Sequence, residues 1–145
     1  MMQPAQQELL LQRLKELSEF VDELEQYTQI TLREYLKNQP HRRQVERMMQ
    51  IVVESAIDTN SLLIKALQKP PADHASQSFE RLFEMKIIGR RLAERFQEYV
   101  SLRNDLVHRY RETKDAELWS SARELVRDTR FYIRNVQQYV ESQEE

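Results

Sequence analysis

The chain has 145 residues, 32% of them charged, with one glycine, 4 prolines, no cysteine and a formal net charge of −2. This length fits a single domain over residues 1–145, and the scarcity of glycine and proline predicts an all-α fold of long helices. The same composition excludes glycine-rich phosphate loops, disulfides, thiolate zinc sites and cysteine nucleophiles.

Apolar residues that recur every three or four positions predict where the helices lie. The first helix is expected over residues 6–37, ending before Pro40, because proline disfavours helical geometry in the preceding residue. The second is expected over residues 45–66, and its wide apolar face predicts that it is the most buried helix. Pro70 and Pro71 must end that helix.

The second half of the chain is expected to hold one short helix and two longer ones. The polar residues 73–78 supply a loop and an N-cap before Phe79, from which a short helix leads to Gly89. A longer helix follows, and the last helix begins at a capping residue, Thr113 or Asp115. Long helices with short connections predict an antiparallel bundle of four to five helices. Their apolar stripes also permit two copies to pair.

Positive charge is concentrated in residues 81–114, which hold 9 basic and 5 acidic residues, whereas the flanking parts are neutral or acidic. A local basic field attracts polyanions whatever the net charge of the chain. Arg95, Arg109 and Arg111 are therefore predicted contacts to a polyanion such as RNA. Ordinary solvated helix faces would show the same charges, so this alternative stays open.

Membrane, metal and cofactor binding find no support in the sequence. No apolar run approaches the roughly 20 residues that span a bilayer, and a signal-peptide pattern is missing, so a cytoplasmic protein is expected. The three histidines, at 41, 74 and 108, have no metal-ligand spacing. Glu54 and Asp58 share a helix face, but a salt-bridged surface explains them better than a metal site. We expect no metal and no cofactor.

One group of residues has the composition of a catalytic site. Arg103 precedes His108 by five positions, a pair that chance alone gives in roughly one chain in three of this composition. Tyr110, two residues after the histidine, lowers the chance expectation to about one per cent. The polar Asn104 beside Arg103 makes coincidence rarer still.

The string RNDLVHRY, residues 103–110, resembles the R-x4-H-x-Y signature of HEPN domains, specifically the HepT-like toxin of HEPN/MNT toxin–antitoxin modules. The resemblance implies a HEPN-like helical bundle, endoribonuclease activity and an active site shared by a homodimer. It also implies a partner, a minimal nucleotidyltransferase antitoxin that silences the toxin by adding AMP to the motif tyrosine, here Tyr110. A phosphodiester at that position would bring negative charge and bulk to the place where RNA phosphate binds.

The motif has the chemistry that metal-independent RNA cleavage requires. A base must take the proton of the 2′-OH, an acid must protonate the departing 5′-oxygen, and a cation must stabilise the phosphorane. His108 titrates near neutral pH, and the planar guanidinium of Arg103 binds two phosphoryl oxygens at once. Because one histidine does not comfortably serve as both base and acid, a two-fold dimer with facing motifs is chemically attractive.

Helix geometry limits how these residues meet. On an ideal helix Arg103 and His108 point about 140° apart, whereas Asn104 and His108 are nearly in line. Arg103 must therefore reach around the helix, or the helix must deform. Asn104 is a supporting residue that orients the imidazole or touches phosphate. Tyr110 lies about 20° from the face of Arg103 and about 10.5 Å further along the axis.

Other interpretations of the same residues remain open. Arg103 would pair with a carboxylate such as Glu98 or Asp105, His108 would cap a helix end, and Tyr110 would be a core aromatic. The chain would then be a non-catalytic module that docks a nucleotidyltransferase or a nucleotide, or a plain dimeric scaffold.

Overall fold

The computed structural model describes residues 2–107 and 115–143. These residues form six α-helices and no β-strand, so the predicted all-α fold is confirmed with one helix more than expected. The helices are α1 (Pro4–Tyr27), α2 (Leu32–Lys37), α3 (Gln39–Ala66), α4 (Ala75–Glu84), α5 (Arg90–Val107) and α6 (Asp115–Ser142). None of the helices in these residues is long and apolar enough to cross a membrane.

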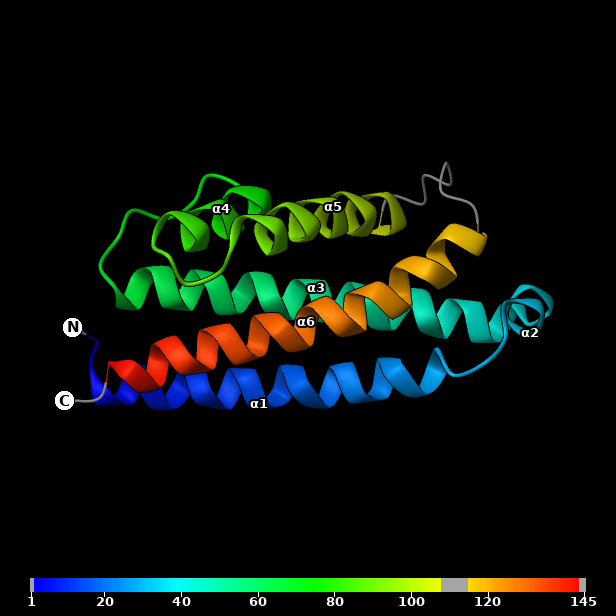
Figure 1. Ribbon diagram of the computed structural model, residues 1–145, viewed down its shortest axis with the longest axis horizontal. Helices are drawn as coiled ribbons and strands as arrows, with labels where there is room; N and C mark the ends of the chain where they lie inside the picture. Colours follow the sequence, from blue (N-terminus) through cyan, green and yellow to red (C-terminus); the bar gives the residue numbers. More distant parts are fainter. Residues whose placement is uncertain (1, 108–114, 144–145) are drawn as a thin grey trace.

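The four long helices run antiparallel to their sequence neighbours, as Figure 1 shows. Helix α1 packs against α3 and α6, while α4 and α5 follow one another along the other side of α3. Helix α5 contacts α3, α4 and α6 and does not contact α1. The two ends of the chain lie at the same end of the bundle.

The additional helix arises because the expected helix over residues 6–37 is interrupted. Helix α1 ends at Tyr27, where the Thr28 hydroxyl donates to the Glu25 carbonyl at 2.8 Å. Thr31 then caps α2, accepting the backbone N–H of Glu34 at 3.1 Å. Threonine hydroxyls bond readily to nearby backbone groups and so favour helix ends over helix interiors. The prediction of one continuous helix is therefore wrong at this point.

Two of the three histidines stabilise helix ends. His41 Nε2 lies 2.6 Å from the Tyr27 carbonyl, an orphan acceptor at the end of α1. His74 is the N-cap of α4, and its Nδ1 accepts the Gln77 N–H at 3.3 Å. Helix α4 thus begins at Ala75, earlier than the expected Phe79. Asp115 is the first residue of α6 and so does not precede it as the expected N-cap would; the other expected cap, Thr113, lies outside the described residues.

The core holds α5 in place through aromatic packing. Helix α3 has more buried residues than any other described helix, as predicted from its wide apolar face. At the centre of the core, Phe79 of α4 stacks on Phe96 of α5, with ring centroids 4.8 Å apart. Tyr132 of α6 packs against both rings, at 5.3 Å from Phe96. Aromatic pairs at these separations contribute beyond their buried area, so the middle of α5 is firmly anchored.

Candidate active site

The predicted site residues divide between the last turns of α5 and the segment that follows it. Arg95, Arg103 and Asn104 lie on α5, which ends at Val107. His108, Arg109, Tyr110 and Arg111 lie outside the described residues. The described structure therefore shows the surroundings in which the first half of the motif is presented.

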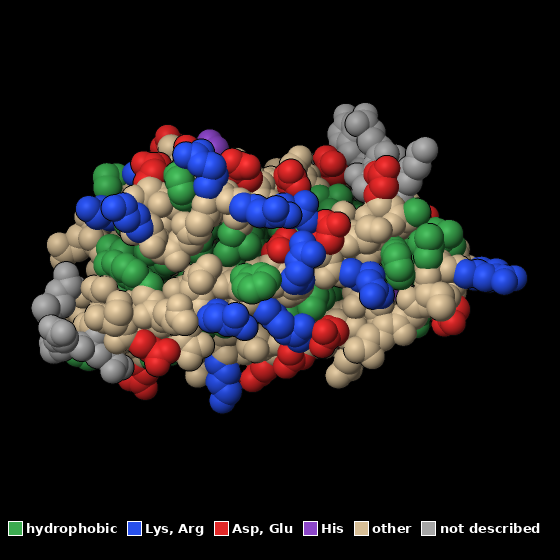
Figure 2. Space-filling view, in the orientation of Figure 1, with side chains coloured by type: hydrophobic (Ala, Val, Ile, Leu, Met, Phe, Trp, Pro, Cys, Tyr) green, Lys and Arg blue, Asp and Glu red, His purple; other side chains and the backbone are tan. Residues whose placement is uncertain are grey.

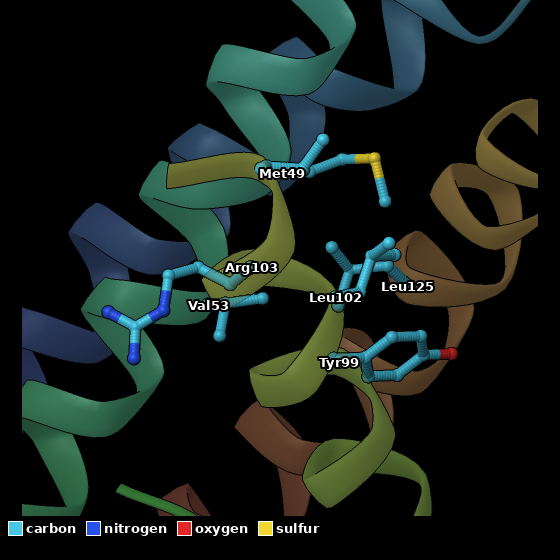
Figure 3. Close-up of a pocket in the computed structure, with 7 residues that line it drawn as sticks. Met49, Val53, Tyr99, Leu102, Arg103 and Leu125 are labelled. Carbon is cyan, nitrogen blue, oxygen red and sulfur yellow. The ribbon is translucent and has the colours of Figure 1, made fainter. Parts of the chain in front are cut away.

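The Arg103 side chain extends from α5 toward α3, with its guanidinium on the side away from Tyr99 (Figure 3). Its Nη1 lies 4.0 Å from Glu54 Oε1 on α3, and its side chain is 21% exposed. Its Nε is buried and has no hydrogen-bond partner among the described residues. The alternative in which Arg103 pairs with Glu98 or Asp105 is not seen; its carboxylate partner among the described residues is Glu54, in one long contact to α3. A cation this weakly paired keeps its capacity to bind an anion.

The base of Arg103 rests in apolar surroundings between three helices. A narrow gap between α3, α5 and α6, too small for a water molecule, is lined by Met49, Val53, Tyr99, Leu102, Arg103, Leu106 and Leu125. Such packing restricts the rotamers of the arginine stem and fixes the last turn of α5. The guanidinium is therefore carried by a rigid support.

Asn104 is exposed on the neighbouring face of α5. Its amide forms no hydrogen bond with any described residue and lies one turn before position 108. The predicted supporting role requires an accessible polar group near the histidine. The exposure of Asn104 is compatible with that prediction, which remains to be tested.

Arg95 is surrounded by carboxylates. Its guanidinium pairs with Glu98 at 3.3 Å, with Asp128 at 3.2 Å and with Glu124. The hydrogen bond to Glu124 is the largest cause of a pKa of Arg95 well above its usual value. An RNA contact by Arg95, as predicted, would have to displace these partners. We regard Arg95 first as a link between α5 and α6.

Tyr99 and Asp128 complete this link, which the sequence reasoning missed. The Tyr99 hydroxyl donates to Asp128 Oδ2 and receives a hydrogen bond from Arg95 Nη2 at 3.0 Å. Burial, followed by the nearby Asp128, raises the pKa of Tyr99 far above its usual value, so the phenol stays protonated. The spacing of four between Arg95 and Tyr99 was visible in the sequence, but their shared partner lies on another helix.

Among residues 2–107 and 115–143, no group of three or more histidine or acidic side chains is arranged to hold a metal ion. The chemistry offered by the described residues is that of a cation, Arg103, and a neutral amide, Asn104, at the end of a rigid helix.

Comparison with known proteins shows which family the chain resembles. Residues 17–136 match the family model described as Ribonuclease HepT-like. A curated protein named tRNA nuclease HepT, from Aphanizomenon flos-aquae (strain 2012/KM1/D3), is 25% identical over 133 residues, which cover 92% of this chain and 90% of that protein.

Solved structures share the fold at lower identity. A structure described as a toxin–antitoxin with AMP-PNP has a TM-score of 0.82 at 16% identity and covers 90% of this chain and 98% of its own. A tri-AMPylated HEPN toxin of Shewanella oneidensis in complex with an MNT antitoxin has a TM-score of 0.76 at 16% identity, covering 94% and 99%. YutE, a cytosolic protein of unknown function from Bacillus subtilis, has a TM-score of 0.75 at 13% identity, covering 99% and 94%. The predicted HEPN-like fold is thereby confirmed.

Proposed function

The chain belongs to the Ribonuclease HepT-like family, and on that premise we propose that it is the toxin of a toxin–antitoxin pair, an endoribonuclease that cleaves RNA without a metal ion. The observation that carries the proposal is that Arg103 is held by packing but is only weakly paired with a carboxylate. It is held rigidly in the last turn of α5, has one long ion pair at 4.0 Å, and stands five positions before His108.

In the proposed reaction His108 acts on the protons and Arg103 on the phosphate. The imidazole takes the proton of the 2′-OH, whose oxygen attacks the adjacent phosphorus. The bond to the 5′-oxygen then breaks, a proton is delivered to that oxygen, and a 2′,3′-cyclic phosphate remains. Arg103 stabilises the charge of the phosphorane. DNA has no 2′-OH and is spared.

We propose that the second proton-transfer group comes from a second copy of the chain. The histidines of the described part are used elsewhere, because His41 binds the Tyr27 carbonyl and His74 caps α4. Val107, the last described residue of α5, is 48% exposed, so an apolar side chain lies open beside the motif. A homodimer with facing motifs would cover it and bring two His108 side chains to one phosphate.

The antitoxin is proposed to be a minimal nucleotidyltransferase that modifies Tyr110. The tyrosine oxygen attacks the α-phosphorus of ATP, AMP is transferred and pyrophosphate leaves. The name of the Shewanella relative, a tri-AMPylated toxin bound to an MNT antitoxin, supports this regulation. The added negative charge would repel RNA phosphate from Arg103.

The proposed activity is tested on purified protein with transfer RNA as the first substrate, a choice supported by the name of the curated relative. We expect cleavage that persists in EDTA and falls at least about 100-fold in His108→Ala, the scale on which general acid–base groups act. His74→Asn is the matched control, since asparagine also caps helices. Cleavage by His108→Ala at the rate of the wild type would refute the assignment. Intact RNA together with a stable nucleotidyltransferase complex would favour the non-catalytic binding module.

A further inference from the structure

Helix α6 carries an exposed aromatic side chain between arginines. Arg127, Phe131 and Arg134 are spaced by four and three positions and therefore share one face of the helix. Phe131 is 48% exposed, and the Arg134 guanidinium lies 5.6 Å from the centroid of its ring. An exposed ring with cations beside it is the arrangement on which nucleic-acid bases stack.

Arg127 and Phe131 form one side of an open groove whose other side is the beginning of α5, and Arg134 lies next to the Phe131 ring outside the groove lining. Gly89, Arg91 and Leu92 face Arg127, Phe131 and Asn135 across it. Figure 2 shows Lys and Arg side chains gathered around hydrophobic ones across the middle of this face of the molecule, over α6 and its border with α5. The groove thus combines apolar surface, an amide and several cations.

Arg95 also lines this groove and is paired with three carboxylates, but Arg91, Arg127 and the adjacent Arg134 have few carboxylate partners. Arg91 and Arg134 form no ion pair within residues 2–107 and 115–143. Arg127, whose side chain is 58% exposed, meets the neighbouring Asp128 at 3.3 Å. Asp128 itself is already bound by Tyr99 and Arg95 on its other oxygen. The groove therefore has a surplus of positive charge that suits a polyanion.

The surface nearer the end of α5 has the opposite charge. A second groove between α5 and α6 is lined by the carboxylates of Glu98, Asp105, Glu117 and Glu124. These carboxylates outnumber the one cation of the lining, Arg95, and disfavour a polyanion there.

We propose that the groove lined by Arg91, Arg127 and Phe131, together with Arg134 beside the Phe131 ring, binds a single-stranded part of the RNA substrate, remote from the bond that is cleaved. Phe131 stacks on a base, and the three guanidiniums contact phosphates. The inference rests on the proposed ribonuclease function, because RNA is its substrate.

The test measures binding apart from cleavage. A fluorescent single-stranded oligouridine of 20 nucleotides is titrated with the full chain carrying His108→Ala, which prevents cleavage, and fluorescence anisotropy gives the Kd. Phe131→Ala should raise the Kd about tenfold, within the range for one stacked base, and Phe131→Trp should restore it. Replacing Arg91, Arg127 and Arg134 together by glutamine should lower the slope of log Kd against log salt by about 2.

The controls lie on α1, which does not contact α5. Leu9→Ala removes another exposed apolar side chain, and Arg13→Gln removes a cation whose partner Glu16 is on the same helix. Both should leave the Kd unchanged. Equal effects of Phe131→Ala and Leu9→Ala, or the absence of any RNA binding, would overturn the inference. A change of oligomeric state in Phe131→Ala, seen by light scattering, would do so too, because the groove would then be an interface between copies.

The two proposals fail in different ways. If the wild-type chain cleaves RNA but the Kd is the same with and without Phe131, the ribonuclease proposal stands and the proposed RNA site in the groove is refuted. If the Kd depends on Phe131 but the wild-type chain cleaves no RNA, the groove remains an RNA-binding site and the ribonuclease proposal is refuted.

Discussion

Replacing Asp128 by alanine should loosen α5 from α6 and weaken the support of Arg103. The buried Asp128 accepts hydrogen bonds from Tyr99 and, at 3.2 Å, from Arg95 Nε. A hydrogen bond to a charged group contributes about 1.5–3 kcal/mol. Arg95 keeps Glu98 and Glu124 and is 24% exposed, so it loses less than the buried Tyr99 hydroxyl. We expect the free energy of unfolding to fall by about 2–3 kcal/mol.

Urea unfolding followed by helical circular dichroism measures this loss. For a chain of this size, the midpoint of Asp128→Ala should lie roughly 1–2 M below that of the wild type. Asp58→Ala, an exposed aspartate on α3, is the control and should change little. Tyr99→Phe should cost about 1 kcal/mol, and the double variant should cost less than the sum of the two. If Asp128→Ala and Asp58→Ala unfold alike, the link contributes nothing and aromatic packing alone positions α5.

Three further outcomes are expected. Thr31→Ala removes the cap of α2 and should lower the free energy of unfolding by about 1 kcal/mol, whereas Thr31→Ser should retain it; equal losses in calorimetry would exclude the cap as the cause. Glu54→Gln frees Arg103 from its long ion pair, so the KM for RNA should fall about two- to fivefold at low salt with unchanged stability; a raised KM would contradict the proposed role of Arg103. Tyr110→Phe should gain no AMP from the partner nucleotidyltransferase and ATP by mass spectrometry, and a modified Tyr110→Phe chain would show that another residue is the target.

The interruption near residue 28 shows why helix periodicity alone misplaces an end. Positions 24, 28, 31 and 35 keep the spacing of one apolar stripe, and Leu24, Thr28 and Tyr35 are all buried. The buried face is therefore continuous although the backbone is not. The exposed carbonyls of the break are bound by distant side chains, with Trp119 Nε1 donating to Ile30 at 3.2 Å and Arg123 to Thr28 at 3.1 Å. Partners about 90 residues away leave no trace in local spacing.

The motif was found from spacing because its residues lie close together in the chain. The residues around the motif could not be predicted in this way, because they come from other helices. Glu54, which contacts Arg103, belongs to α3, and Asp128, which binds Arg95 and Tyr99, belongs to α6. Local sequence predicts which residue types are present and which helix face they share. Only the packed bundle decides whether a given cation is already neutralised.

Arg95 and Arg103 make this difference concrete. They lie on the same helix, eight residues apart, so their side chains are separated by about 80° around the axis and about 12 Å along it. That rotation turns Arg95 toward the carboxylates of α6 and Arg103 toward α3, where Glu54 lies at the limit of ion pairing. A charge count gives the two residues equal weight. The bundle instead uses the first arginine to fix the helix, whereas the second, two turns later, has only one long ion pair and remains the proposed anion-binding residue.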